Sequence, residues 1–327
     1  MPEELTRPAI HIGLLNYPGA MQSALHGMTE MFFFADRICA EHAQAQLPRF
    51  VTSRYLLQDD TVVLDSASAA QTTEPLSRLH VLVVPPSVGN LYYRQPSASL
   101  LDWLKHVHAS GTLICSACAG TFILAAAGLL EQRRATTHWN LAVDFQHCFP
   151  QVRLDTDRIL INDGDIITAG GLMSWLDLGL ELVEQFTRPA IVLELGKWLI
   201  LDTGNREQRF YKKFIPVFDH GNALVIKAQR FIQKTYMKPV TIRELAAECC
   251  VTERTLLRNF ASATGYTPLA YIQQVRIQSA RELIETTTLR IEQVALRVGY
   301  EDSSAFRKIF KKLTGLTPGE YRSRFVA

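Results

Sequence analysis

The chain has 327 residues, 47% of them hydrophobic, and a formal net charge of +2. This length favours two domains. No apolar run approaches the roughly 18 residues of a membrane span and no signal peptide is indicated, so neither membrane insertion nor secretion is expected. The six cysteines lack zinc-site spacing, so no metal site is expected. No cofactor is expected either, and reduced thiols fit a bacterial cytoplasm.

The charge is divided unevenly along the chain. Residues 221–327 hold 17 Lys and Arg against 9 Asp and Glu, a net of +8, and residues 1–220 hold 17 against 23, a net of −6. A basic C-terminal third joined to an acidic body indicates a DNA-binding domain attached to a domain with another role.

Segments of strand and helix character alternate in the N-terminal body. In chain order they lie at residues 10–17 (strand), 23–41 (helix), 81–86 (strand), 97–109 (helix), 112–115 (strand) and 120–130 (helix). Such alternation predicts an α/β domain with a parallel sheet flanked by helices. Ligands of these sheets bind at the carboxyl ends of the strands.

One strand-to-helix junction is chemically suggestive. Cys118 is flanked by the small residues Ala117 and Ala119, as in a nucleophile elbow, where a sharp turn projects the side chain. A helix N-terminus would lower the pKa of this thiol. His138 follows twenty residues later as a candidate partner. The spacing alone still favours a small buried cysteine and a structural histidine.

Residues 8–190 resemble the class I glutamine amidotransferase-like fold in its ThiJ/PfpI branch. The matching pieces are Tyr17-Pro18-Gly19, Ser116-Ala117-Cys118-Ala119-Gly120, Gly128-Leu129-Leu130, Thr136-Thr137-His138-Trp139, Asp163-Gly164 and Thr168-Ala169-Gly170-Gly171. The resemblance places Cys118 on the elbow cysteine of that family and His138 on the histidine of its Thr-His-Trp segment.

The chain departs from that family at one position. Where relatives carry an acidic residue before an apolar-small-Gly-Pro run, this chain reads Ala24-Leu25-His26-Gly27-Met28. Glu30 is close in sequence but is expected to be an ordinary helix residue. Without an acid beside the thiol, covalent catalysis loses a partner that activates the nucleophile. No enzymatic activity is therefore expected.

A connection between domains is predicted at residues 201–221, where periodicity is weak and Gly204 and Gly221 break the pattern. Its aromatic side chains indicate that it packs against protein; they are Phe210, Tyr211, Phe214 and Phe218. A docked linker and a dimer surface are both consistent with this composition.

The C-terminal region contains the same helical unit twice, fifty residues apart. The first copy is marked by Thr252, Leu256, Arg258, Phe260, Thr264-Gly265, Thr267-Pro268 and Tyr271, and the second by Asp302, Phe306, Lys308, Phe310, Thr314-Gly315, Thr317-Pro318 and Tyr321. So many matched residue classes in register indicate an internal repeat of a small supersecondary unit.

Each copy has the plan of a helix-turn-helix motif, whose second helix enters the DNA major groove. Thr241 and Glu244 fit a capping box at the start of the first helix, and Thr252 is placed to cap the second. In the second copy the turn falls at Gly299, and Asp302 is placed to cap the next helix. A long helix at residues 268–285 would fix the separation of the two motifs, about one helical turn of DNA or roughly 34 Å.

The outer faces of the two second helices carry the candidate DNA contacts. They are Arg254, Thr255 and Arg258 in the first copy, and Ser304, Arg307, Lys308, Lys311 and Lys312 in the second. Arginine bonds guanine edges bidentately, and Lys or Ser adds base or phosphate contacts. Any one of these residues also fits an ordinary solvated helix, but their matched placement favours DNA.

Residues 222–325 resemble the DNA-binding domain of the AraC/XylS transcription regulators. The resemblance covers the first motif, Arg276 and Ala280 of the long helix, the run from Val294-Ala295 to Gly299-Tyr300, and the residues from 306 to 322. It departs at Cys250, where the turn of the family usually has Gly. A non-Gly residue there needs a positive φ.

A branch of AraC-type regulators carries a ThiJ/PfpI-type domain as its sensor, and the two resemblances together cover nearly the whole chain. They imply a ligand-sensing domain at residues 8–200, the connection, and a double helix-turn-helix domain at residues 222–327. The implied function is a sequence-specific transcription regulator controlled by a small molecule, and the family favours activation.

The effector is expected at the strand ends, with Asn16, Pro86, Cys118, Trp139 and Ala169 as candidate ligand contacts. The expected partners are double-stranded promoter DNA, the small-molecule effector, RNA polymerase and a second copy of the chain, without a membrane. Two alternatives stay open. One is a cysteine-dependent amidase or hydrolase fused to a DNA-targeting module, and the other is a redox sensor whose Cys118 thiol is oxidised.

Overall fold

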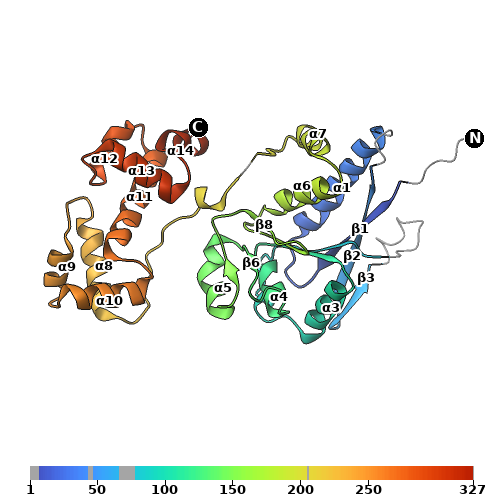
Figure 1. The fold of residues 1–327 in the computed structure, drawn as a ribbon, viewed down its shortest axis with the longest axis horizontal. Helices are drawn as coiled ribbons and strands as arrows, with labels where there is room; N and C mark the ends of the chain where they lie inside the picture. Colours follow the sequence, from blue (N-terminus) through green and yellow to red (C-terminus); the bar gives the residue numbers. More distant parts are fainter. Residues whose placement is uncertain (1–6, 43–46, 66–77, 205, 327) are drawn as a thin grey trace, which may run out of the picture. The chain divides into compact units, whose positions relative to one another are not determined.

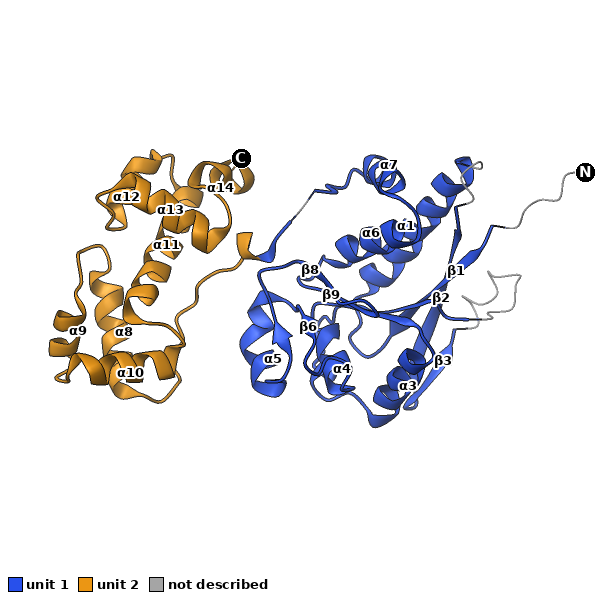
Figure 2. Cartoon of the chain, viewed as in Figure 1, with its two compact units in different colours: residues 1–208 blue, residues 209–327 orange. Residues whose placement is uncertain are grey.

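The computed structural model describes residues 7–42, 47–65, 78–204 and 206–326. The chain forms two compact units, an N-terminal unit of residues 1–208 and a C-terminal unit of residues 209–327 (Figure 2). The division lies inside the segment that the sequence assigns to the connection. Within the described ranges, no helix is both long and apolar enough to cross a membrane.

A seven-stranded sheet forms the centre of the N-terminal unit, in the order β3-β2-β1-β4-β5-β9-β8 (Figure 1). Its strands are β1 (Ala9–Asn16), β2 (Arg49–Gln58), β3 (Thr61–Leu64), β4 (Val81–Val84), β5 (Leu113–Ala117), β8 (Leu160–Asn162) and β9 (Ile166–Ala169). The five strands from β2 to β9 in this order are parallel to one another. The two outermost strands are antiparallel to their neighbours, β3 to β2 and β8 to β9. Two short strands, β6 (Arg134–Ala135) and β7 (Arg153–Leu154), form a separate parallel pair.

Helices cover both faces of this sheet (Figure 1). One face carries α1 (Gln22–Glu41), α6 (Trp175–Phe186) and α7 (Pro189–Leu199), and the other carries α3 (Ala98–Ala109) and α4 (Gly120–Ala126). The remaining helices of the unit are α5 (Ala142–Cys148) and the short 3-10 turns η2 (Tyr92–Arg94) and η3 (Trp139–Leu141); a third turn, η4 (Gln208–Phe210), spans the division. Because both faces are covered, β4, β5 and β9 are buried along their whole length. The predicted α/β domain with a parallel sheet is confirmed.

The predicted helix at residues 120–130 is shorter in the structure and ends at Ala126. Ala127 caps it, and Gly128 then adopts a left-handed φ of 74°. Glycine is the usual residue in that conformation because it has no Cβ to clash. The apolar residues after Ala126 extend the sequence pattern of the helix, but the backbone leaves the helical conformation at Gly128.

The C-terminal unit is helical throughout its regular structure. Its helices are α8 (Ala223–Thr235), α9 (Ile242–Glu248), α10 (Glu253–Thr264), α11 (Pro268–Thr286), α12 (Ile291–Arg297), α13 (Ser303–Thr314) and α14 (Pro318–Phe325). It has two hydrophobic cores, one for each copy of the repeat. The long helix α11 contributes Tyr271 and Val275 to the first core and Ile277 and Ile284 to the second. The predicted long helix is thus confirmed, and both copies pack on it.

Candidate functional site

Cys118 occupies the sharp turn between β5 and α4. Its backbone has a left-handed φ of 54°, and its N–H donates to the carbonyl of Ala169 at 2.7 Å. Thr137 Oγ1 donates to the carbonyl oxygen of Cys118, also at 2.7 Å. At Gly120 a Cβ atom would lie 2.6 Å from the carbonyl oxygen of Val84, so only glycine fits there. The turn therefore has the geometry of the elbow that its small residues predict.

The thiol of Cys118 is not the ionised group that a helix N-terminus would produce. The residue is 4% exposed, and this burial raises the pKa of the thiol to about 11, against a smaller lowering by the backbone N–H of Ala119. The expectation of a lowered pKa is therefore wrong. Desolvation disfavours the thiolate more than the N–H stabilises it. At neutral pH the group is a neutral thiol.

His138 has a structural partner of its own. Its Nδ1 accepts a hydrogen bond from the N–H of Asn140 at 3.0 Å, which caps η3. Burial lowers the pKa of the ring, which favours its neutral form. Among the described residues, no hydrogen bond joins the side chains of His138 and Cys118. The arrangement agrees with a structural histidine.

At the position where the ThiJ/PfpI relatives carry an acidic residue, this chain has the methyl side chain of Ala24. Ala24 lies on α1 and is fully buried, whereas Glu30 is exposed on the same helix. Tyr17, just after β1, is buried, and its hydroxyl donates to the carbonyl of Pro85 at 2.7 Å. Burial raises the pKa of this phenol, with a smaller rise from Cys118. The thiol is thus accompanied by a neutral phenol, which is no substitute for an activating acid or base.

Four of the five predicted effector contacts lie at the ends of neighbouring strands. Asn16 ends β1, Pro86 follows β4, Cys118 follows β5 and Ala169 ends β9. Because these four strands are adjacent and parallel, their carboxyl ends lie at one edge of the sheet. The fifth residue, Trp139, is in η3. Asn16 and Trp139 are half-buried and the other three are buried.

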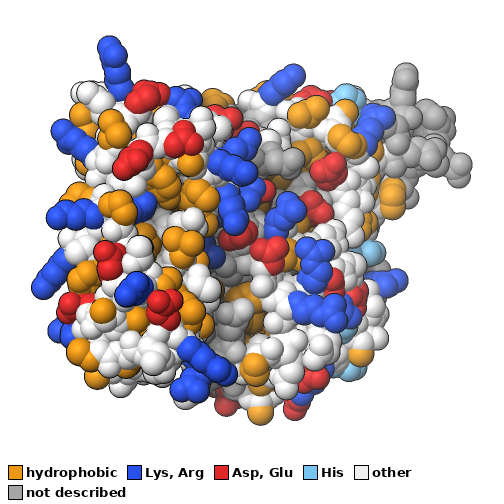
Figure 3. Space-filling view, turned by 60° about the vertical axis from the view of Figure 1, so that its left-hand side comes forward, with side chains coloured by type: hydrophobic (Ala, Val, Ile, Leu, Met, Phe, Trp, Pro, Cys, Tyr) orange, Lys and Arg blue, Asp and Glu red, His pale blue; other side chains and the backbone are white. Residues whose placement is uncertain are grey.

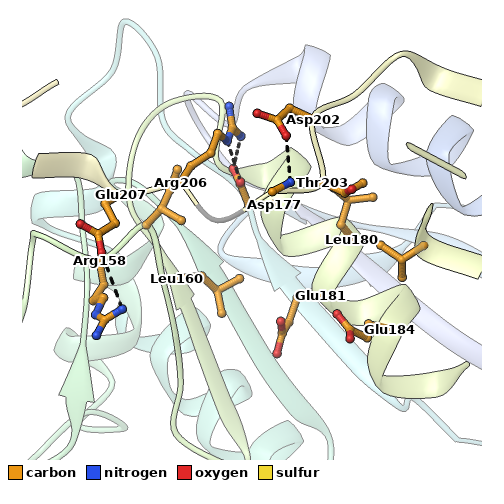
Figure 4. Close-up of a pocket in the computed structure, with 13 residues that line it drawn as sticks. Arg158, Leu160, Asp177, Leu180, Glu181, Glu184, Asp202, Thr203, Arg206 and Glu207 are labelled. Carbon is orange, nitrogen blue, oxygen red and sulfur yellow. Dashed lines mark hydrogen bonds and ion pairs between the residues drawn. The ribbon is translucent and has the colours of Figure 1, made fainter. Parts of the chain in front are cut away.

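A cavity of about 330 Å³ lies elsewhere in the N-terminal unit, beside α6 and the chain that follows α7 (Figure 4). None of the five predicted effector contacts lines it. Its charged lining residues are Asp177, Glu181, Glu184, Asp202 and Glu207, with Arg158 and Arg206. Arg206 donates to both carboxylate oxygens of Asp177, at 3.1 and 2.6 Å. No pattern in the sequence indicates this cavity, because its residues come from three segments that only the fold brings together.

Gln208 is a buried polar residue that the sequence analysis did not single out. It lies in η4, at the end of the N-terminal unit, and is 3% exposed. Its Nε2 donates to Thr136 Oγ1 at 3.0 Å and to the carbonyls of Thr137 and Arg158, both at 2.9 Å. Its Oε1 accepts from the N–H of Trp139 at 3.1 Å. Gln208 thus belongs to the hydrogen-bonded framework around the Cys118 turn.

The first helix-turn-helix motif consists of α9 and α10. Thr241 Oγ1 accepts from the N–H of Glu244, whose carboxylate accepts from the N–H of Thr241, so the predicted capping box is confirmed. Thr252 caps α10 by accepting from the N–H of Thr255. In the turn between the helices, Cys250 has a left-handed φ of 56°. This is the conformation that the departure from glycine requires.

The second motif consists of α12 and α13. Asp302 caps α13 by accepting from the N–H groups of Ser304 and Ala305, at 2.8 and 3.3 Å. Gly299 in the turn has a φ of 88°, and a Cβ atom there would lie 2.6 Å from the carbonyl oxygen of Met237. The two copies therefore share one backbone plan, although the second turn is one residue longer and leaves no space for a side chain at Gly299.

The predicted DNA contacts lie on the sides of α10 and α13 that face away from the cores. Leu256 and Phe260 are fully buried beneath α10, as are Phe306 and Phe310 beneath α13. Thr255 is half-buried, and the other seven predicted contacts are exposed: Arg254, Arg258, Ser304, Arg307, Lys308, Lys311 and Lys312. Figure 3 shows how Lys and Arg side chains stand out from the surface.

The two recognition helices, α10 and α13, differ in charge. Lys311 and Lys312 of α13 correspond to Ala261 and Ser262 of α10. Arg307 of α13 forms an ion pair with Glu292 of α12, in which about half of each side chain is exposed. Within the described chain, no ion pair engages Arg254, Arg258 or Lys308. These three side chains are therefore available to a ligand.

Arg276 of α11 links the end of α8 to the second motif within the C-terminal unit. Its Nε and one terminal nitrogen donate to the carbonyls of Tyr236 and Lys238, at 2.7 and 2.9 Å. Its guanidinium also lies 5.2 Å from the ring centre of Tyr300, in the turn of the second motif. One side chain thus holds the end of α8 and the second motif in a single geometry.

Comparisons with known proteins match both units. Residues 76–185 match the model of the DJ-1/PfpI family, and residues 245–324 match a helix-turn-helix domain model. The HTH-type transcriptional regulator CdhR of Pseudomonas aeruginosa is 28% identical over 259 residues, 79% of this chain and 76% of that protein. The regulator GlxA of Rhizobium meliloti is 26% identical over 230 residues, 68% of each chain.

One relative matches almost end to end. The HTH-type transcriptional regulator ArgR of Pseudomonas aeruginosa is 30% identical over 326 residues, which is 98% of this chain and 95% of that protein. The match therefore spans both units of this chain. The chain therefore belongs to the AraC-type helix-turn-helix transcription regulators that carry an N-terminal DJ-1/PfpI domain.

Proposed function

We propose that this regulator senses a small molecule in its N-terminal unit and changes its affinity for promoter DNA in response. The observation that carries the proposal is the meeting of four strand ends beside the Cys118 turn, at the edge where α/β sheets bind ligands. The proposed ligand contacts are Asn16, Pro86, Cys118, Trp139 and Ala169. A ligand that binds one of two protein states better shifts the population towards that state.

The N-terminal unit acts in this proposal as a sensor and not as an enzyme. Three observations support this role: the neutral, buried thiol of Cys118, the capping role of His138, and the methyl group of Ala24 at the position of the acid. The relatives that match the chain are named as transcriptional regulators. A hydrolase would need an activated nucleophile, which this arrangement does not provide.

The recognition helices read two successive stretches of major groove, about 34 Å apart. On α10, Arg254, Thr255 and Arg258 contact bases and adjoining phosphates. On α13, Ser304, Arg307 and Lys308 have the same role, while Lys311 and Lys312 contact phosphate. The higher charge of α13 supports a larger share of sequence-independent attraction for the second motif.

The cavity beside α6 is the second candidate location for the effector. Its lining holds five carboxylates and two guanidinium groups, a net of −3, which favours a cationic ligand. Glu181→Gln and Ala169→Val separate the two locations. The first should weaken effector binding only if the effector occupies the cavity, and the second only if it occupies the strand ends.

We further propose that the protein acts as a homodimer and activates transcription through RNA polymerase in the bacterial cytoplasm. The resemblance to AraC-type regulators supports activation, and the bacterial source of the relatives supports the setting. Sedimentation of the full chain with and without operator DNA tests the dimer. A protein that is monomeric in both conditions would refute it.

A thermal-shift screen of the full chain tests the sensing function. All four tryptophans, Trp103, Trp139, Trp175 and Trp198, lie in the N-terminal unit, so their fluorescence follows the unfolding of the sensor alone. A binder stabilises the native state by mass action. The proposal requires that such a compound also changes the operator affinity of the full chain.

Cys118→Ala separates the sensor from its alternatives. In the sensor, the variant changes the effector response while operator binding without effector is kept. Loss of measurable turnover of an amide or ester would support the hydrolase. Peroxide-dependent operator binding that the variant abolishes would support the redox sensor.

A further inference from the structure

The chain passes from one unit to the other at the peptide bond between Gln208 and Arg209. Both residues belong to the single 3-10 turn η4. On each side of this bond, a buried polar side chain holds the main chain to its own unit. The two anchored segments are therefore joined without a spacer residue.

On the N-terminal side, three consecutive residues are anchored. Arg206 forms the two hydrogen bonds to Asp177 described above, and Glu207 pairs with Arg158 in an isolated antiparallel bridge. Gln208 then buries its amide, whose two hydrogens are shared among three acceptors. A Cβ atom at Gly170 would collide with this amide. The fold thus leaves a slot that the Gln208 side chain fills.

Two of the three acceptors of Gln208 belong to residues that also support the Cys118 turn. The carbonyl of Thr137 accepts from Gln208, and the hydroxyl of the same threonine donates to the carbonyl of Cys118. The hydroxyl of Thr136 accepts from Gln208, and the carbonyl of Thr136 accepts from Thr121 Oγ1 at 3.1 Å. A shift in the strand ends or in the turn at Trp139 therefore changes the geometry of this slot.

On the C-terminal side, the anchor is Arg281 of α11. It is 5% exposed, and its guanidinium donates to the carbonyls of Arg209, at 3.2 Å, and Lys212. The guanidinium also lies 5.5 Å from the ring centre of Tyr321 in α14. A buried cation that loses its acceptors carries a large desolvation penalty. The carbonyls after Gln208 are thus held by the helix on which both helix-turn-helix motifs pack.

A second contact fixes the same segment to α11. The N–H of Phe214 donates to Gln278 Oε1 at 3.2 Å, and the Phe214 ring packs edge-on against Tyr271 at 5.1 Å between centres. Residues 209–214 therefore follow α11 and are not a flexible tether. This docking agrees with the aromatic composition from which packing was expected.

We propose that Gln208 and Arg281 are positioning residues that couple the sensor to the DNA-binding unit. Ligand-driven changes at the Cys118 turn alter the Gln208 slot, and the adjoining peptide bond passes the displacement to the carbonyls held by Arg281. The inference rests on the proposed sensing function, for which it names the route of regulation. Coupling between two sites is reciprocal, so DNA binding must in turn affect the Gln208 slot.

Reciprocity allows a test that needs no effector. The probe is an operator duplex that the full-length protein selects from a random library. Hydrogen exchange is measured in peptides covering residues 118–121 and 136–140, with and without saturating duplex. In the wild type, the duplex is expected to change exchange in both peptides, although neither belongs to the DNA-binding unit.

The decisive variant inserts Gly-Ser between Gln208 and Arg209. Both anchors keep their own partners, so each unit stays folded and operator affinity is retained, but the exchange response to DNA is lost. The same Gly-Ser placed between the exposed residues Phe218 and Asp219, within the C-terminal unit and after the residues that follow α11, is the matched control and keeps the response. A purely structural role for the anchors would make the two insertions equivalent.

Gln208→Glu is a second variant that does not alter chain length. It removes both amide hydrogens and places a carboxylate against three acceptors, so the side chain leaves its slot. It should also lose the exchange response, with tryptophan fluorescence reporting that the sensor remains folded. A wild-type response that is absent, or one that survives the insertion at Gln208, overturns the coupling. If the compound screen finds no effector, the coupling result is unaffected, so the two proposals fail separately.

Discussion

Cys250 and Gly299 are each the second residue after the first helix of their motif, and both have a left-handed backbone, with φ of 56° and 88°. Each lies within the turn between the two helices of its motif. Only Gly299 is closely approached, since a Cβ there would lie 2.6 Å from the carbonyl oxygen of Met237. The first copy can thus hold a side chain at this position, whereas the second has no space for one.

The two turns should respond in opposite directions to substitution. Cys250→Gly removes the strain of a non-glycine residue with a left-handed backbone, which costs about 1 kcal/mol. About 0.5 kcal/mol of this gain is offset, because glycine raises the conformational entropy of the unfolded chain. The variant should be as stable as the wild type or slightly more so. Gly299→Ala should lower the free energy of unfolding by more than about 1 kcal/mol, because the strain of a left-handed backbone adds to the collision of the new Cβ with Met237.

Urea unfolding followed by far-ultraviolet circular dichroism measures both effects, with tryptophan fluorescence as the control for the N-terminal unit. If Gly299→Ala proves as stable as the wild type, the turn geometry of the second motif is wrong.

Arg258 is predicted to read a base. It is exposed on α10 and no ion pair engages it within the described chain. Arg258→Ala should cost about 1–3 kcal/mol of operator affinity and relax specificity at one base position. Selection of operators by the variant from a random library gives the readout. Lys308→Ala, the equivalent change in the second copy, should relax a position about one helical turn away.

Lys311 and Lys312 are predicted to contact phosphate. Each substitution by alanine should weaken binding to all sequences alike and reduce the slope of log affinity against log salt by about 0.9. Lys105→Ala is the matched control, since it removes the same charge from α3, where Lys105 pairs with Asp102. Equal slopes for the control and for both lysine variants would refute the phosphate contacts.

The thiol of Cys118 is predicted to be unreactive at neutral pH. Its pKa of about 11 means that the neutral form dominates below that value, so at pH 8 only about one molecule in a thousand carries the thiolate. Alkylation by iodoacetamide, followed by peptide mapping, should therefore label the exposed Cys148 and Cys250 first. Labelling of Cys118 should accelerate about tenfold per pH unit as the pH rises towards 11. Rapid labelling at pH 7 would contradict a buried thiol.

Local patterns in the sequence predicted the helical repeat well. Capping residues such as Thr241, Thr252 and Asp302 act on backbone groups two or three residues away, so their effect is visible in a short window. The fifty-residue register was confirmed for the same reason, since α10 and α13 bury the matching residues Leu256 and Phe306. Buried strands β1, β4 and β5 were also found from their apolar runs.

The pattern was less informative where structure depends on distant partners. The mixed sequence of β2 becomes a strand because it pairs with β1 from Arg49 to Leu56. The prediction of a lowered pKa for the Cys118 thiol is wrong for a related reason. A helix N-terminus can be recognised from neighbouring residues, but the burial that raises the pKa of the thiol is produced by the whole domain.

By itself the sequence determined the two-part plan, the duplicated motif with its outward basic residues, and the family to which the chain belongs. These follow from composition, periodicity and local hydrogen bonding, which act over short stretches of chain. Only the tertiary structure decided that Gln208 lies among the supports of Cys118, about seventy residues from Thr136 and Thr137 in the chain. It also decided that Arg281 holds the carbonyl of Arg209. Buried polar contacts of this kind depend on desolvation by the complete fold, and no local pattern encodes it.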